Sequence, residues 1–195
     1  IYNRIKKKTL LKDQILNHFD FKRKNIKLEF YDHHLCHLSS AFLASSFDKA
    51  VGLSVDGFGD FTSVAWAKCE NGKIKIIDRI YFPNSLGIFY EAITQLLQFN
   101  NYGDEYKVMG LSAYGKPFYV DNLQKLFIDI KYPILEKSYF NHLDKNFNYQ
   151  FEGSPNQNKI FKDKINNLFD FDLISISEEK KADIAKSCQV IFENY

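Results

Sequence analysis

One segment constrains the fold of this 195-residue chain more than any other, the stretch 31–60. His33 and His37 are four residues apart, so on a helix they share one face. The apolar run 50–55 then predicts a short buried strand. Asp56 comes at the carboxyl end of this strand, where α/β folds place ligand-binding groups. The segment therefore predicts a helix beside a strand, with two imidazoles and one carboxylate available to one site.

These three side chains could form a metal site. Two imidazoles and a carboxylate suit Fe(II) or Zn(II) and leave coordination positions open. The competing interpretation is a helix that carries two partly exposed histidines. Gly57 and Gly59, which follow the carboxylate, also admit two interpretations. Their backbone N–H groups could approach a phosphate, or they could belong to a hairpin turn between two strands.

The composition indicates an ordinary globular protein, with 45% hydrophobic and 26% charged residues. A net charge of +2, from 26 basic and 24 acidic residues, gives no indication of a nucleic-acid partner. No apolar run is long enough to cross a membrane. The three cysteines are scattered and form no Cys-x-x-Cys pair, so we expect a reducing cytoplasm rather than a disulfide framework or a zinc ribbon.

Apolar spacing predicts the remaining elements. Helices are expected over 9–19, 34–46, 86–99, 121–130, 158–168 and 177–195, strands over 26–31, 62–69 and 73–81, and strand-like pieces in 137–151. Asn71-Gly72 predicts a hairpin, and Ser85 and Ser177 are expected helix N-caps. These elements place the chain in the α/β class, with an antiparallel meander in a mixed sheet.

Two further features have a functional and a structural interpretation. The segment 103–117 contains three glycines and mixed charges, which predict a loop that either binds a ligand or only connects two elements. The basic stretches 4–8 and 22–27 could bind phosphate, although solvated helix ends explain them more simply.

Several motifs, in this order and at this spacing, resemble the ATP-dependent O-carbamoyltransferases, which include the nodulation-factor and antibiotic-tailoring enzymes. The resemblance is tight over 31–117 and looser through the final helix. The motifs are Asp32-His33-His34-x-x-His37-x-x-Ser40-Ala41-Phe42, Phe47-Asp48, Val55-Asp56-Gly57-x-Gly59-Asp60, Phe82-Pro83-Asn84-Ser85-Leu86-Gly87-x-x-Tyr90 and Gly103-Asp104-Glu105-Tyr106-Lys107-Val108-Met109-Gly110-Leu111 with Ala113-Tyr114-Gly115.

The resemblance implies a fold and a reaction. The larger domain of this family has the actin/sugar-kinase/Hsp70 (ASKHA) ATPase fold. A smaller YrdC-like domain makes carbamoyl-adenylate from carbamoyl phosphate and ATP. The larger domain then transfers the carbamoyl group to a hydroxyl of a small molecule, such as a sugar or a secondary metabolite. The expected partners are therefore carbamoyl phosphate, ATP and a hydroxyl-bearing acceptor, and Mg(II) is a further candidate ion.

By its motifs, the resemblance also assigns roles to residues. His33, His37 and Asp56 fall on the family's iron ligands. His34 could orient the substrate, act as a base or simply pack. Glu105 and Lys107 would lie near the reacting groups, or would form a buried structural contact with each other. The residues expected near the nucleotide are Gly57, Gly59, Gly87 and Tyr90.

The resemblance further implies that 1–195 is a partial ASKHA domain. The first phosphate loop, the downstream half of the domain and the YrdC-like domain are not found in this sequence, so we expect the fragment alone to be inactive. A partial sheet would expose strand edges, which makes a homodimer a candidate assembly. The alternative functions are a non-catalytic ASKHA-like nucleotide-binding or assembly module and a tRNA threonylcarbamoyl-transfer enzyme.

Overall fold

The computed structural model describes residues 14, 15, 17, 18, 29–101, 103–129, 131–144, 147 and 158–195. The chain divides into two compact units, Ile1–Asp32 and His33–Tyr195. In the first unit, residues 14, 15, 17 and 18 are helical, and 29–32 have no regular structure. The rest of the expected helix over 9–19, the first part of the expected strand over 26–31 and both basic stretches lie outside the described residues.

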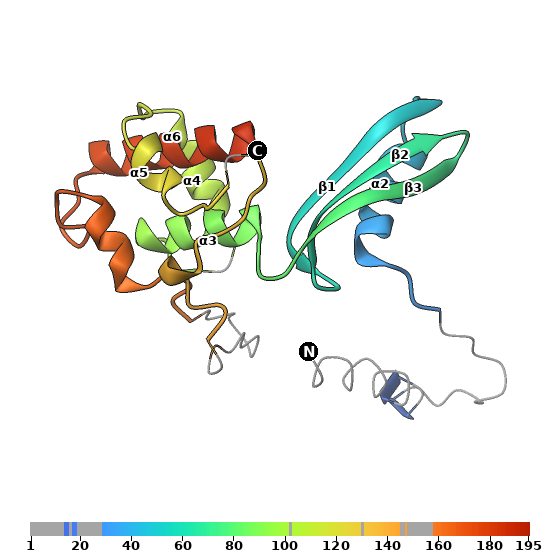
Figure 1. The fold of residues 1–195 in the computed structure, drawn as a ribbon, viewed down its shortest axis with the longest axis horizontal. Coiled ribbons are helices and arrows are strands. Elements are labelled where there is room, and N and C mark those ends of the chain that lie inside the picture. The colour runs from blue at the N-terminus through green and yellow to red at the C-terminus, as the bar shows by residue number, and fades with distance from the viewer. Residues whose placement is uncertain are drawn as a thin grey trace. The chain divides into compact units, whose positions relative to one another are not determined.

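The second unit begins with a helix and a three-stranded meander (Figure 1). Helix α2 spans His33–Leu43, and strands β1, β2 and β3 span Lys49–Gly59, Thr62–Glu70 and Lys73–Tyr81. Both strand pairs are antiparallel, in the order β1-β2-β3. Asn71 and Gly72 form the second hairpin with φ values of 53° and 68°, as a type I′ turn requires. The predicted helix, meander and hairpin are therefore confirmed.

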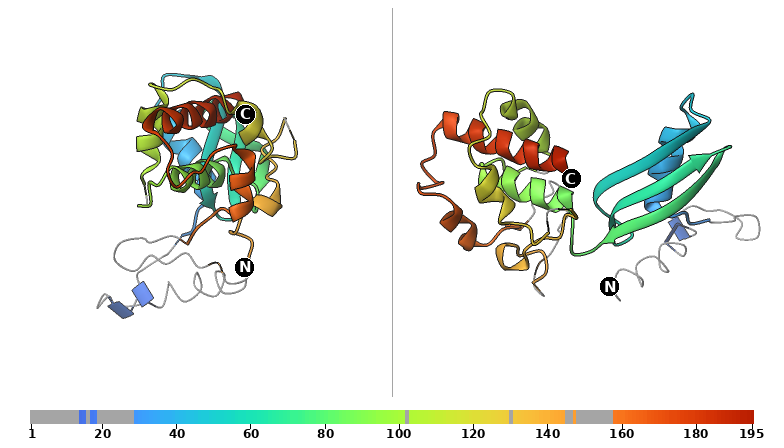
Figure 2. Two further views of the ribbon diagram at one scale, coloured as in Figure 1. Left: turned by 90° about the vertical axis from the view of Figure 1, so that its left-hand side faces the viewer. Right: turned by 45° about the horizontal axis from the view of Figure 1, so that its top comes forward.

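Helix α2 covers only one face of this sheet (Figure 2). Leu38 and Phe42 pack there on the small side chains of β2. Gly52 allows the close approach, because a Cβ atom at this position would lie 2.8 Å from Leu38 Cδ2. On the opposite face Val51 and Leu53 are 80% and 59% exposed. The expectation that the run 50–55 is a buried strand is thus wrong for alternate residues, because no described element covers their face.

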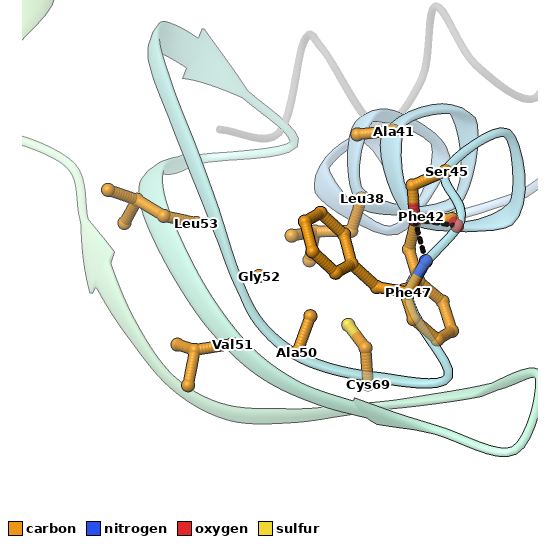
Figure 3. Close-up of a pocket in the computed structure, with 10 residues that line it drawn as sticks. All are labelled: Leu38, Ala41, Phe42, Ser45, Phe47, Ala50, Val51, Gly52, Leu53 and Cys69. Atoms are coloured by element: carbon orange, nitrogen blue, oxygen red, sulfur yellow. Dashed lines mark hydrogen bonds between the residues drawn. The ribbon is translucent and has the colours of Figure 1, made fainter.

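A small apolar pocket of about 280 Å³ lies between α2 and β1 (Figure 3). Phe42, Phe47 and Cys69 line it, and Val51 and Leu53 lie on the far side of β1 from them. The loop after α2 is held by two hydrogen bonds of Ser45: its hydroxyl donates to the Phe42 carbonyl at 2.7 Å and accepts from the Phe47 N–H at 3.3 Å. The pocket is part of the interface that fixes α2 on the sheet.

A helical part follows the meander and contains the larger core. Its elements are α3 (Leu86–Leu96), α4 (Glu105–Ser112), α5 (Val120–Gln124), α6 (Glu178–Asn194) and the 3₁₀ helices η2 (Lys137–Tyr139) and η3 (Asp163–Leu168). Ser85 and Ser177 cap α3 and α6 by accepting from the N–H groups of Ile88 and Lys180. Both predicted caps are therefore confirmed. The largest fully buried side chains here include Phe89, Ile93, Leu123, Leu126, Leu135, Phe140, Ile160, Ile165 and Ile184.

The segment 103–117 is not a loop, since α4 occupies its centre. Gly103, at φ +87°, lies just before α4, and Gly115 lies just after it. A Cβ atom at Gly115 would overlap the carbonyl oxygen of Ala182 in α6, at 1.9 Å. Two of the glycines that suggested a loop thus serve the helix ends and a helix–helix contact, which local sequence does not reveal.

Two other predicted helices differ in length or type, and the strand-like pieces expected in 137–151 are found only in part. The helix expected over 121–130 shortens to α5. In 137–151, η2 occupies 137–139 and Phe140 forms an isolated β-bridge with Phe161, while 145, 146 and 148–151 lie outside the described residues. The helix expected over 158–168 begins only at Asp163, as the 3₁₀ helix η3, because Phe161 pairs instead with Phe140 in an isolated β-bridge. The architecture is a mixed α/β one with a three-stranded antiparallel sheet. Among the described residues, no helix combines the length and apolarity needed to cross a membrane.

Candidate functional site

The structure brings His33, His37 and Asp56 together. The two histidines lie one turn apart on α2, and Asp56 faces them from β1. His33 Nε2 lies 2.6 Å from Asp56 Oδ2 and 2.9 Å from His37 Nε2, and His37 Nε2 lies 3.7 Å from Asp56 Oδ2. All three side chains are partly exposed, between 35% and 55%, so an ion from solvent could reach them.

These donor atoms fit a divalent transition metal. Ligand atoms bound about 2.1 Å from one ion lie about 3.0 Å apart in an octahedral shell and about 3.4 Å apart in a tetrahedral one. The separations of 2.6, 2.9 and 3.7 Å bracket these values. Among the described residues, these three form the group of histidine, cysteine and carboxylate side chains that could hold a metal. Two imidazoles and a carboxylate suit Fe(II) or Zn(II) and leave positions for other ligands.

An irregularity in β1 presents Asp56 to the helix. The pairing with β2 is regular up to Val55 and resumes only at Gly59, so Asp56 lies where the register shifts. Burial raises the pKa of Asp56, whereas the hydrogen bonds from His33 and Gly57 and the charges of the two histidines lower it. The net pKa is below its ordinary value of 3.8, which favours the ionised form that binds metal.

His34 lies beneath this site and is fully buried. Its Nδ1 is 2.8 Å from Ser54 Oγ, and its Nε2 is 2.9 Å from the Thr62 carbonyl oxygen. Because the carbonyl can only accept, Nε2 donates and Nδ1 accepts from the serine hydroxyl. Both ring nitrogens therefore bond α2 to β1 and β2. This geometry corresponds to the packing alternative for His34 rather than to a base that contacts a substrate.

The three glycines predicted near a nucleotide have different surroundings. A Cβ atom at Gly87 would lie 2.8 Å from Gly57 Cα, so these two glycines let α3 approach the β1 backbone. Gly57 has open space where its own Cβ would be. Gly59 instead faces the ring of His33, which a Cβ atom there would overlap at 1.9 Å. Gly59 thus belongs to the histidine cluster and does not line the pocket described next.

A pocket of about 340 Å³ opens beside Asp56. Two predicted nucleotide residues besides Gly57, namely Gly87 and Tyr90, line it. Tyr90 is nearly buried and donates its hydroxyl proton to Gln189 Oε1 at 2.8 Å. The full lining is Asp56, Gly57, Gly87, Tyr90, Glu91, Gly103, Glu105 and Met109. The pocket volume lies within the range of about 300–1,000 Å³ that is typical of small-molecule sites.

Sequence reasoning missed Glu91, which lines this pocket from α3. Its Oε1 is buried and has no hydrogen-bond partner among the described residues. Burial, and then the negative charge of Glu105, raise the pKa of Glu91 to about 8. A carboxyl group that is mostly buried without a partner is rare unless a ligand uses it. The only sequence signal was an acidic residue inside an otherwise apolar helical pattern.

Glu105 and Lys107 do not contact each other as a buried pair. Glu105 lines the pocket, whereas Lys107 is not part of its lining. Lys107 Nζ forms an ion pair with Asp104 Oδ1 at 2.7 Å, just before α4 begins. Asp104 Oδ2 also accepts from the N–H of Asn101 at 3.1 Å. The structure therefore places Glu105 near the candidate site and assigns Lys107 to the anchoring of the α4 N-terminus.

The contact between Gly87 and Gly57 gives a stability prediction. We expect Gly87→Ala to lower the free energy of unfolding by about 1–3 kcal/mol, because the new methyl group must push α3 away from backbone atoms of β1. Gly110→Ala is the control, since this exposed α4 position has open space and alanine there should stabilise by about 0.5–1 kcal/mol. Urea unfolding of both variants measures the difference, and equal stabilities would contradict it.

Comparisons with known proteins identify the family. The family model described as the carbamoyltransferase N-terminus matches residues 1–195. The chain belongs to the carbamoyltransferase family. The resemblance of the ordered motifs to O-carbamoyltransferases is thereby confirmed.

Individual proteins match this chain over different lengths. An uncharacterized Synechocystis protein, sll1178, is 34% identical over 193 residues, which is 95% of this chain and 29% of that protein. Nodulation protein NolNO of Sinorhizobium fredii is 36% identical over 110 residues, 56% of this chain and 16% of that protein. Nodulation protein NolO of Bradyrhizobium diazoefficiens is 39% identical over 117 residues, which is 58% of this chain and 20% of that protein. The chain thus spans less than a third of the length of these relatives.

Proposed function

We propose that this chain is part of an ATP-dependent O-carbamoyltransferase that transfers a carbamoyl group from carbamoyl-adenylate to a hydroxyl of a sugar or a secondary metabolite. Membership of the carbamoyltransferase family supports the transfer class. The more specific part of the proposal, a reaction at a metal next to a nucleotide, rests on the convergence of His33, His37 and Asp56 beside a pocket of about 340 Å³. Because the chain spans only part of its relatives, the complete activity is proposed for the longer protein.

The three ligand residues would hold Fe(II) or Zn(II) at the pocket edge. Asp56 both belongs to this group and lines the pocket, so a metal there would lie next to a bound ligand. The metal would supply Lewis-acid stabilisation of the negative charge on the adenylate phosphate. His34 would keep the ligands in place, because its hydrogen bonds to Ser54 and Thr62 join the helix to two strands.

The pocket would bind the nucleotide part of carbamoyl-adenylate. Gly57 and Gly87 leave backbone exposed at its wall, which allows a phosphate to approach closely. Glu91 would form hydrogen bonds with ribose hydroxyls, a role that acidic residues have in other nucleotide sites. In the transfer, the acceptor oxygen forms a bond to the carbamoyl carbon and its hydroxyl proton is released to solvent, while the bond from that carbon to the phosphate oxygen breaks and AMP leaves.

The domains of the longer protein can be proposed in the same way. We propose that residues 1–195 form part of an ASKHA-type domain and that a YrdC-like domain elsewhere in the protein makes the carbamoyl-adenylate. ATP and carbamoyl phosphate would then be substrates of the whole protein. Mg(II) would accompany the ATP, and no residue of this chain is assigned to it.

The test uses the longer protein with ¹⁴C-labelled carbamoyl phosphate, ATP and a mixture of methyl glycosides as acceptors. We expect AMP release together with label in the glycoside fraction, and loss of the label transfer in Asp56→Ala. The exposed Asp48→Ala is the matched control and should transfer normally. Absence of AMP release and of labelled product would contradict the proposal. Transfer that persists in Asp56→Ala would favour a non-catalytic role of this chain instead.

A further inference from the structure

We infer that Gly59 and Asp60, at the turn between β1 and β2, are positioning residues that set the orientation of His33 toward Asp56. This inference rests on the proposed metal site, for which His33 is a ligand. Neither residue belongs to the group of candidate ligands, and neither lines the pocket beside Asp56. Their effect would therefore be exerted entirely through α2 and the His33 ring.

Gly59 provides the space in which the His33 ring lies. A Cβ atom at Gly59 would be 1.9 Å from His33 Cδ2, 2.3 Å from Cγ and 2.5 Å from Nε2. Distances below about 3 Å between nonbonded carbon atoms are strongly repulsive. The three nearest atoms in this overlap all belong to the His33 ring, which can rotate about its side-chain bonds. An added methyl group would therefore displace the ring while the backbones of α2 and β1 could stay in place.

Asp60 holds the first turn of α2. Its Oδ2 accepts a hydrogen bond from the backbone N–H of His33 at 3.2 Å. His33 is the first residue of α2, so this N–H has no acceptor within the helix. The carboxylate is also favourably placed next to the positive end of the helix dipole. The same residue that carries the candidate ligand is thus fixed through its main chain by Asp60 and through its ring by Gly59.

The turn itself has the geometry that this contact requires. Gly59 pairs with Thr62, and the two residues between them, Asp60 and Phe61, have φ values of 50° and 66°. Two successive positive φ values define a type I′ hairpin turn. Aspartate adopts this conformation readily, but phenylalanine does so rarely. The strained turn lies next to the candidate ligands, where it directs the Asp60 carboxylate at α2.

The first test measures binding of Co(II), a spectroscopic probe for such sites, by the 195-residue chain. We expect Gly59→Ala to weaken Co(II) binding by about 10–100-fold and to alter the visible d–d bands, as is typical when the support of a metal ligand is changed. The control Gly110→Ala, which adds the same methyl group in open space, should bind Co(II) like the parent chain, and thermal unfolding of Gly59→Ala should remain cooperative. Equal affinity and equal spectra in the two variants would overturn the inference.

The second test requires no metal. In the parent chain we expect a nuclear Overhauser effect between His33 Hδ2 and the Gly59 Hα protons, because the ring lies on this glycine. The ¹⁵N shift of His33 Nε2 should change in Gly59→Ala and stay unchanged in Gly110→Ala. An unchanged His33 signal in Gly59→Ala would contradict the positioning role. Failure of the parent chain to bind Co(II) would instead count against the proposed metal site, and the NMR result would still decide the role of Gly59.

Asp60 is tested by rescue. Asp60→Ala removes the acceptor for the His33 N–H and should weaken Co(II) binding, whereas Asp60→Asn keeps an acceptor oxygen and should restore most of the affinity. Asp48→Ala, an exposed carboxylate outside this contact, is the control. Affinity that is equal in Asp60→Ala and Asp48→Ala would show that the turn does not support the site.

Discussion

Replacing His33 or Asp56 by alanine is expected to lower the Zn(II) affinity of the chain by more than about 100-fold, since even changes outside the ligand set cost about 10–100-fold. Each substitution removes one of three donor atoms that lie within 4.8 Å of one another. Two remaining ligands cannot enforce a coordination geometry, so the loss should exceed that of any change in the surroundings. Competition titration against a zinc indicator measures this difference directly.

Two control variants distinguish the loss of a metal ligand from a general effect of changing a nearby exposed residue. Cys36→Ser changes a neighbouring exposed thiol on the same helix, and Asp48→Ala removes an exposed carboxylate before β1. Neither residue belongs to the His33–His37–Asp56 group, so both variants should bind Zn(II) like the parent chain. A parent chain that binds no metal, or an Asp56→Ala variant that binds as tightly as Asp48→Ala, would reject the metal site.

Replacing Glu91 by glutamine is expected to change how stability depends on pH. The folded-state pKa of Glu91 is raised from 4.5 to about 8, first by burial and then by the charge of Glu105. Between these two values the unfolded chain releases the proton and the folded chain keeps it, so the unfolded state binds fewer protons. Stability of the parent chain should therefore fall as pH rises through this window, by up to about 1.4 kcal/mol per pH unit.

Glutamine cannot ionise, so Glu91→Gln should lose this slope. The variant should be more stable than the parent at pH 8, and the advantage should shrink toward pH 5. Glu105→Gln should narrow the pH window of this slope from its upper end, because it removes the second cause of the raised pKa. Glu179→Gln, at an exposed position of α6, is the control that keeps the parent slope. Identical urea-unfolding profiles of Glu91→Gln and Glu179→Gln from pH 5 to 8 would contradict the prediction.

The Zn(II) titrations and the pH profiles probe one region of the molecule. Asp56 is shared between the candidate ligands and the pocket that Glu91 lines. Zn(II) affinity reports on the first group, and the pH profile reports on the second without any ligand. A chain that loses metal in Asp56→Ala and gains stability at pH 8 in Glu91→Gln would have both parts of the proposed site.

Elements with strong local signals were predictable from sequence. The helical spacing of His33 and His37 is realised in α2, and the alternating strands with the Asn71-Gly72 turn form the meander. Ser85 and Ser177 cap their helices because a cap involves only neighbouring residues. The grouping of the two histidines with Asp56 was also predictable, since one helix and the next strand bring them together. Their metal binding stays a prediction.

Other features depend on residues that are distant in sequence. The exposure of Val51 was missed because it depends on which elements cover each face of the sheet. Segment 103–117 suggested a loop because local sequence does not reveal why Gly115 is needed, namely its close contact with the Ala182 backbone in α6. The burial of His34 and the position of Glu91 at a pocket wall likewise follow from the packing of α2 and α3 on β1.

Short spacings along the chain were thus enough to indicate which side chains could bind a metal and which family the motifs resemble. Which neighbours support those side chains depends on tertiary contacts. Gly59 and Asp60 act on His33 across a separation of up to 27 residues, and only folding brings them together. Steric exclusion and hydrogen bonding operate over a few ångströms, so these roles exist only where the folded chain creates the contact.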